Sequence, residues 1–223
     1  MSSSYSVVMP AFNAEKTIGA AIESALSQTL SPQVIIVVDD GSSDRTAECA
    51  RAFGERVSVV RQSNSGCGAA TTRGFDAVAT PFVACLDADD LWIQQKAALQ
   101  MQRLAAAPEL DGVFSLARLF KDGQTPRPDA PVQQLWGRTT MLMRTASVRR
   151  VGPVIDPAHS RGDMVDWIAR AREFGIRLEM MPVVLAQRRI IPGSLSYGRD
   201  ERDYGYLQVV KAALDRKRRG TTG

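Results

Sequence analysis

Three carboxylates crowd into four residues in the stretch Leu86-Asp87-Ala88-Asp89-Asp90. This acidic stretch follows an apolar run, residues 81–85, that predicts a buried strand. Carboxylates gathered at a strand end repel one another, so a divalent cation that carries a phosphorylated substrate would suit them. The alternative is an acidic loop that caps a helix expected over residues 92–107, because aspartate is a favoured cap.

A second acidic pair, Asp39-Asp40, follows the β-branched run at residues 34–38. Together with Gly41, these aspartates suit a tight turn between a strand and a helix, and from these residues alone we prefer that structural explanation. A carboxylate in this turn could also accept the imide N–H of uracil. That hydrogen bond would discriminate among bases.

A run of small residues, Gly66-Cys67-Gly68-Ala69-Ala70-Thr71-Thr72-Arg73, opens a predicted helix. Glycine lets the backbone approach a ligand closely, and a helix start favours a phosphate. The run is not a dinucleotide fingerprint, because the GxGxxG spacing fails and the run follows the third predicted strand. Arg73 could pair with a diphosphate or a base, or it could be an exposed helix charge.

The elements that must position these residues alternate along the first half of the chain. Strands are expected at residues 5–9, 34–38, 57–61 and 82–86, and helices at 17–29, 44–53 and 66–78. This alternation predicts an α/β fold with a doubly wound, mostly parallel sheet, in which ligands collect at the carboxyl ends of the strands. In the second half, strands are expected at 112–120, 141–143 and 178–187 and helices at 92–107, 147–151, 163–174 and 201–218.

The composition is typical of a soluble globular protein, with 44% hydrophobic and 23% charged residues in a chain of 223. The net charge of +4 is concentrated near the end, at Lys211 and residues 216–219. This basic tail could make a peripheral contact with an anionic membrane, whereas nucleic acid binding is not expected because no reading motif accompanies it. Three separated cysteines, no signal peptide and no membrane span favour the cytoplasm, with the inner membrane face as an option.

Taken together, Pro10-Ala11-Phe12-Asn13, the Asp39-Asp40 turn, the Gly66 to Arg73 run and the acidic stretch resemble the family 2 glycosyltransferases of GT-A fold. The resemblance is strong over residues 5–105 and looser to about 197. It implies one domain over 1–223, with a nucleotide-sugar-binding half at 5–105, an acceptor half at 106–197, and a C-terminal helix and basic tail at 198–223. It also implies a Rossmann-like sheet with a smaller mixed half on the acceptor side.

The same resemblance assigns roles. In the family, the segment here Pro10 to Asn13 lines the nucleotide pocket, the position of Asp40 holds uracil, and that of Asp87 binds ribose. Asp89 or Asp90 would bind Mn²⁺ or Mg²⁺ bridging the diphosphate of a UDP-sugar. The full set expected to bind the donor is Pro10, Ala11, Phe12, Asn13, Asp39, Asp40, Gly66, Gly68, Arg73, Asp87, Ala88, Asp89, Arg188 and Arg189.

On the acceptor side, Gly162-Asp163-Met164-Val165-Asp166-Trp167 matches the family segment that supplies the catalytic base. Met164 stands where aspartate is usual, so Asp163 or Asp166 is expected to take the proton from the acceptor hydroxyl. The structural alternative is that both carboxylates only favour the positive end of a helix. The chain also has Ile191 where many members carry a histidine, although Arg188 and Arg189 could still neutralise the diphosphate.

These residues predict a metal-dependent transfer of a sugar from a nucleotide-sugar, a UDP-sugar, to an acceptor hydroxyl with inversion. The acceptor is left open among a glycan, a lipid-linked glycan, a peptide and a small molecule. Met164 and Ile191 motivate a first alternative, a catalytically impaired relative that binds sugar nucleotide. A GT-A-like nucleotidyltransferase, which would release pyrophosphate, is the second alternative.

Overall fold

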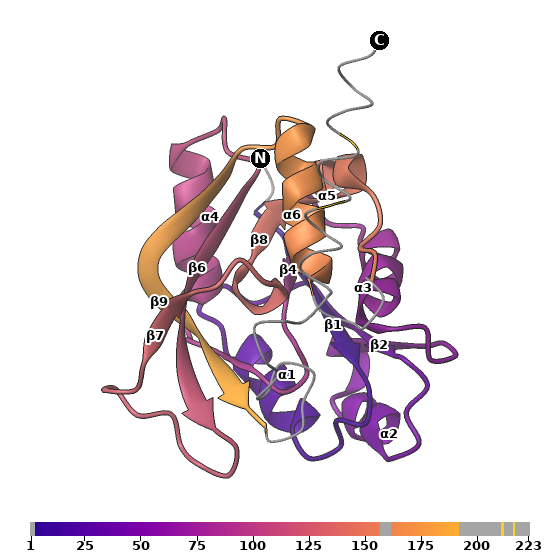
Figure 1. Cartoon of the computed structure of the whole chain (residues 1–223). Coiled ribbons are helices and arrows are strands. Elements are labelled where there is room, and N and C mark those ends of the chain that lie inside the picture. Colours follow the sequence, from indigo (N-terminus) through magenta and orange to yellow (C-terminus); the bar gives the residue numbers. More distant parts are fainter. Residues whose placement is uncertain (1–2, 157–161, 192–210, 212–215, 217–223) are drawn as a thin grey trace.

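The structure, a computed structural model, describes residues 3–156, 162–191, 211 and 216 (Figure 1). The helix expected at residues 201–218 therefore lies outside the described residues, except for Lys211 and Arg216. Within the described residues, no helix is long and apolar enough to cross a membrane.

Nine strands of the described residues form one sheet in the order β3-β2-β1-β4-β8-β6-β9-β5, with β7 paired to β6 (Figure 1). The strands are β1 (Tyr5–Ala11), β2 (Val34–Asp39), β3 (Val57–Arg61), β4 (Phe82–Cys85), β5 (Leu91–Trp92), β6 (Gly112–Lys121), β7 (Val132–Gln134), β8 (Leu142–Arg144) and β9 (Leu178–Ile190). β1 runs parallel to β2 and β4, and β2 runs parallel to β3. The predicted parallel sheet is thus confirmed for the first half.

Helices cover both faces of this sheet. They are α1 (Ile18–Leu26), α2 (Thr46–Arg51), α3 (Cys67–Asp76), α4 (Lys96–Ala106), α5 (Thr145–Val151) and α6 (Asp163–Glu173), with 3₁₀ turns η1 (Gly54–Arg56) and η2 (Arg138–Thr140). One apolar cluster joins α1 and α4 to the sheet, and a second joins α3, α5 and α6 to it. Because both faces are covered, every residue of β1 is buried, as expected of a central parallel strand.

Two of the differences between the predicted and observed elements involve β9. The helix expected to begin at Trp92 begins instead at Lys96, because Leu91 and Trp92 pair with Gln187 and Ala186 of β9. The strand expected at 178–187 extends to Ile190 and passes through Pro182 with shifts of register against β6. An irregularity of this kind accommodates proline, which has no backbone N–H to offer the ladder.

A buried lysine ties α4 to η2. Lys96 is 0% exposed, and its Nζ donates hydrogen bonds to Gln100 Oε1 (2.7 Å) and to the Met141 carbonyl (3.1 Å). The ammonium also lies 4.1 Å from the centroid of the Trp92 ring. Gln100 Nε2 in turn donates to the carbonyl of Thr140 at 2.8 Å. Burial lowers the pKa of Lys96 to about 7.

This lowered pKa predicts how stability depends on pH. Between about pH 7 and the ordinary lysine value, the unfolded chain holds a proton on Lys96 that the folded chain has lost, so folding becomes more favourable as pH rises. The difference in unfolding free energy between wild type and Lys96→Met should therefore shift in favour of wild type from pH 7 to pH 9.5. Urea unfolding at several pH values measures it, with the exposed Lys121→Met as the control. An equal difference at all pH values would contradict the prediction.

Candidate active site

The turns after β1 and β2 are bonded to each other at the carboxyl edge of the sheet. The Asn13 backbone N–H donates to Ser42 Oγ, and Asn13 Oδ1 accepts the Ser43 N–H, each at 2.9 Å. Asn13 adopts a positive φ of 48°, which asparagine tolerates better than most residues. Pro10 and Ala11 are buried in β1, whereas the Phe12 ring is 51% exposed. The first predicted segment thus presents one aromatic side chain at this edge.

The two aspartates after β2 have separate internal partners. Asp39 is buried, accepts the Ser42 N–H at Oδ1, and has Oδ2 3.1 Å from Arg61 Nε. Asp40 accepts Gln62 Nε2 (2.8 Å) and the N–H groups of Ser65 and Gly66 (2.9 Å each). Asp40 therefore fixes the loop that leads into α3. The predicted contact with uracil stays a prediction, and it would have to use lone pairs that these bonds leave free.

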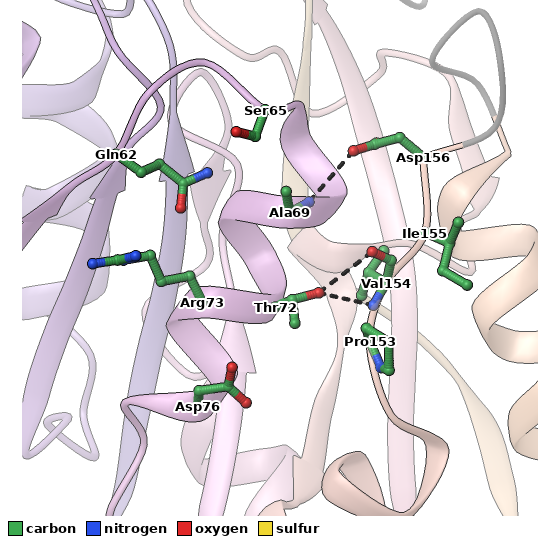
Figure 2. A pocket seen from close by; sticks show the side chains of 10 residues that line it. All are labelled: Gln62, Ser65, Ala69, Thr72, Arg73, Asp76, Pro153, Val154, Ile155 and Asp156. Carbon is green, nitrogen blue, oxygen red and sulfur yellow. Dashed lines mark hydrogen bonds between the residues drawn. The ribbon is translucent and has the colours of Figure 1, made fainter.

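The glycine-rich start of α3 receives a carboxylate from the second half of the chain. Asp156 Oδ1 and Oδ2 accept the Gly68 N–H at 2.9 and 2.8 Å, and Figure 2 shows Asp156 facing the first turn of the helix. A Cβ on Gly68 would lie 2.9 Å from Asp156 Oδ2 and from the Val154 carbonyl. A Cβ on Gly66 would lie still closer to Asp156 Oδ2, at 2.4 Å, and Gly66 has a φ of 96°. Both glycines are thus explained by Asp156, and the start of α3 already binds an anion from within the chain.

Arg73 lies on an exposed part of α3 and extends away from Asp156 (Figure 2). It lines an open depression of about 550 Å³ between α3 and residues 153–156. In the described part of the chain, Arg73 has no ion-pair partner. Its predicted pairing with a donor group is not tested by these contacts.

The acidic stretch after β4 is held by η2. Arg138 Nε donates to Asp87 Oδ1 at 2.8 Å, and the Thr139 hydroxyl donates to Asp90 Oδ2 at 2.6 Å. Asp90 Oδ1 also accepts the Arg189 N–H at 2.7 Å. Both Asp90 oxygens are therefore engaged. The Asp89 carboxylate, by contrast, has no hydrogen bond or ion pair to another described residue, although Arg189 Nε donates to its backbone carbonyl at 2.7 Å.

The electrostatics of the stretch favour a cation. Burial, and then the neighbouring Asp87 carboxylate, raise the pKa of Asp89 to about 6. Burial and the charges of Asp89 and Asp87 raise the pKa of Asp90 well above its usual range. Arg188 and Arg189 oppose the shift at Asp89, so both predicted arginines lie near the stretch.

Within the described residues, no three His, Cys, Asp or Glu side chains converge as a metal site of their own. The residues fit a divalent ion that one carboxylate, Asp89, would hold together with substrate phosphates, which is a common arrangement for Mg²⁺.

The two predicted bases lie in the first turn of α6 and have different partners. Asp163 forms an ion pair with Arg138 Nη1, so one guanidinium joins Asp163 to Asp87. Asp166 accepts Arg170 Nε (2.9 Å) and Arg216 Nη1 (3.0 Å). Arg170 also donates to the Val151 and Pro153 carbonyls, which makes the Asp166 pair part of the packing of α6. Both carboxylates are buried.

Sequence reasoning missed Arg138, Thr139 and Asp156. Arg138 and Thr139 stand in no recognisable motif, and only the fold brings η2 against the acidic stretch. Asp156 lies 88 residues from the helix start that it caps, so no local pattern could have found it.

Comparisons with known proteins agree on one family. Residues 6–155 match the family described as Glycosyl transferase family 2. The chain is 35% identical over 101 residues to the Escherichia coli UDP-Glc:alpha-D-GlcNAc-diphosphoundecaprenol beta-1,3-glucosyltransferase WfgD, covering 44% of this chain and 40% of WfgD. It is 35% identical over 129 residues to the putative glycosyltransferase EpsH of Bacillus subtilis, covering 56% of this chain and 37% of EpsH. The chain therefore spans well under two thirds of the length of these relatives.

Among solved structures, Staphylococcus aureus TarS 1–349 in complex with UDP-GlcNAc is similar, with a TM-score of 0.74 and 18% identity. The match covers 94% of this chain and 65% of that one. At this identity the likeness concerns the fold, which is the predicted GT-A fold.

Gly68 and Gly19 each occupy the second position of a helix, but only Gly68 is close to Asp156. Alanine at these two positions should therefore change the unfolding free energy in opposite directions. Gly68→Ala should lower the unfolding free energy, by about 1–3 kcal/mol, because its Cβ meets Asp156 and the Val154 carbonyl. Gly19→Ala in α1 should raise it by up to about 1 kcal/mol, since no atom lies within 4 Å of the new Cβ and alanine favours a helix. Denaturant unfolding of both variants measures the contrast, and stabilisation by Gly68→Ala would contradict this account of the glycine.

Proposed function

The chain belongs to glycosyl transferase family 2, and on that premise we propose that it transfers a sugar from a nucleotide-sugar, a UDP-sugar, to an acceptor hydroxyl with inversion. The observation that carries the proposal is the link from Asp87 through Arg138 to Asp163. It sets a carboxylate of the predicted donor site close to a carboxylate of the predicted acceptor side. A single displacement needs a donor site and a base held together in this way.

On the donor side, Asp87 would bind the ribose and the Phe12 ring would stack on the base. An exposed aromatic ring at the end of β1 supports this role, because stacking needs an open face. Asn13 and Asp40 would hold the edge of the base. The solved TarS complexes with UDP and with UDP-GlcNAc, which share the fold, are consistent with such a donor.

A Mn²⁺ or Mg²⁺ ion, held by Asp89 and the donor diphosphate, would neutralise the negative charge that develops on the departing nucleotide. The Asp89 carboxylate has no partner in another residue that the structure describes, which supports this choice over Asp90, whose oxygens bind Thr139 and Arg189. Arg188 and Arg189 would add positive charge near the same diphosphate.

In the reaction, the acceptor oxygen would form a bond to the anomeric carbon as the bond from that carbon to the diphosphate breaks. The nucleoside diphosphate would leave with the bonding electrons, and the acceptor proton would pass to a carboxylate. We favour Asp163 as this base, because Asp166 is bound by two arginines that also pack α6. One displacement without an enzyme nucleophile inverts the anomeric carbon.

The acceptor is proposed to be a glycan, and a lipid-linked glycan above the other classes. The name of WfgD describes a diphosphoundecaprenol-linked acceptor, and WfgD is 35% identical to this chain over 101 residues. A peripheral contact with an anionic membrane through Lys211 and the basic residues after it would suit such an acceptor.

The metal assignment predicts unequal effects of two neighbouring substitutions. Asp89→Asn should weaken Mn²⁺-dependent UDP binding more than about tenfold, or roughly 1.4 kcal/mol, because it removes the proposed ligand. Asp90→Asn should change that affinity less and lower the melting temperature, since it disturbs the bonds to Thr139 and Arg189. Calorimetry with and without Mn²⁺ measures both, and an unchanged affinity in Asp89→Asn would contradict the assignment.

The choice of base predicts a separation of binding from turnover. Asp163→Asn should keep UDP affinity within about threefold and lower kcat about a hundredfold or more. Asp166→Asn, which loosens the packing of α6, should mainly lower the melting temperature. The assay follows UDP release from a panel of UDP-sugars with glycan acceptors. Turnover by Asp163→Asn at the wild-type rate would place the base elsewhere.

The same assay judges the overall proposal. Release of pyrophosphate in place of UDP would identify a nucleotidyltransferase. Binding of UDP without turnover on any acceptor would identify the impaired relative.

A further inference from the structure

Arg138 has a buried guanidinium that faces two carboxylates from distant parts of the chain. Its side chain is 14% exposed, with Nε bonded to Asp87 and Nη1 paired with Asp163. A guanidinium is planar and directs its N–H groups at fixed angles, so it fixes the direction of each carboxylate that it binds. The two acidic groups are 76 residues apart in the sequence, and this one side chain fixes their relative position in space.

The backbone that carries Arg138 is itself held firmly. Trp92 Nε1 donates to the carbonyl of Thr139 at 2.8 Å, and Gln100 Nε2 donates to the carbonyl of Thr140 at 2.8 Å. The Thr139 hydroxyl also binds Asp90. A side chain on a constrained turn loses little conformational entropy when it binds a partner. Arg138 is therefore suited to hold a carboxylate in one position.

The contacts of Asp87 and Asp163 indicate which of the two carboxylates depends more on Arg138. Asp87 keeps a neighbour in Thr139, whose hydroxyl lies 3.3 Å from Asp87 Oδ2, so Asp87 has support besides Arg138. Asp163 has Arg138 as its ion-pair partner among the described residues. Removal of the guanidinium would therefore release Asp163 more than Asp87, and would leave a buried carboxylate without its partner.

We propose that Arg138 is a positioning residue that uses Asp87 as its anchor to orient Asp163 toward the acceptor hydroxyl. The inference rests on the proposed function, in which Asp163 takes the proton. Arg138 itself touches neither the donor nor the acceptor in this role. The acceptor would then bind next to a base whose orientation is already fixed.

The first experiment tests the contact without any substrate. Melting temperatures are compared for wild type, Arg138→Met, Asp163→Asn and the double variant. Because each single change breaks the same pair, the double variant should melt at least about 3 °C above the value expected from adding the two losses. The control cycle pairs Asp163→Asn with Arg103→Met, which breaks the Arg103–Glu179 ion pair between α4 and β9 and should be additive. Additivity in the Arg138 cycle would overturn the inference.

The second experiment tests the role in turnover. Arg138→Met should lower kcat about a hundredfold, with UDP affinity within about threefold of wild type, because the base is misdirected while the donor is still bound. Arg138→Lys should recover about tenfold of that loss, since a lysine keeps the charge without the fork. It also serves as the test variant if Arg138→Met does not fold. Arg103→Met, which breaks an ion pair distant from the acidic stretch, should retain wild-type kcat.

The outcomes separate the two proposals. A parallel loss of UDP affinity and kcat in Arg138→Met would place Arg138 on the donor side, and wild-type kcat would remove it from the mechanism. Either result overturns the inference. An inactive wild type would overturn the proposed function, and the positioning role would fall with it. The melting comparison would still show whether the Arg138 pair exists.

Discussion

The crowding of carboxylates at the end of β4 is the constraint on which the rest of the site depends. Asp87, Asp89 and Asp90 lie within four residues, and burial makes their mutual repulsion costly. The structure meets this cost with different partners: a guanidinium for Asp87, and a hydroxyl and a backbone N–H for Asp90. Among the three, Asp89 is the one whose carboxylate has no partner in another described residue, which is why we propose it as the cation ligand.

These partners depend on a support that lies deeper in the protein. η2 carries Arg138 and Thr139. The α4 side chains Lys96 and Gln100 donate hydrogen bonds to the backbone carbonyls of Met141 and Thr140, at the end of this turn. Trp92 closes the same region by donating to Thr139 and by packing against the Lys96 ammonium. The two-residue strand β5 is what places Trp92 there. A buried polar network of this kind specifies one arrangement, because each member left without its partner would be destabilising.

The sequence predicted the donor half well, and for a physical reason. Strands such as 57–61 are short, mostly apolar runs that can be recognised from a few consecutive residues. The turns that follow parallel strands lie at one edge of the sheet, independent of which side chains they carry. Elements and contacts that depend on partners distant in the sequence were predicted less well. Trp92 was assigned to a helix since it has helical spacing, yet pairing with Ala186 decides its conformation. At Gly66 and Gly68 the contact with a donor phosphate stays a prediction, and no sequence pattern indicated the Asp156 carboxylate that crowds both glycines.

Met164 shows how a departure from the family pattern can leave the chemistry possible. In the resemblance, aspartate is usual at this position, but here Met164 is buried in the apolar cluster with Trp167 and Phe75. A carboxylate in those surroundings would lack partners, and the base that we propose lies at a neighbouring residue. One residue earlier, on the turn that faces η2, Asp163 meets the guanidinium of Arg138. The arginine that balances the acidic stretch is therefore also what makes Asp163, rather than position 164, a place where a buried carboxylate is stable.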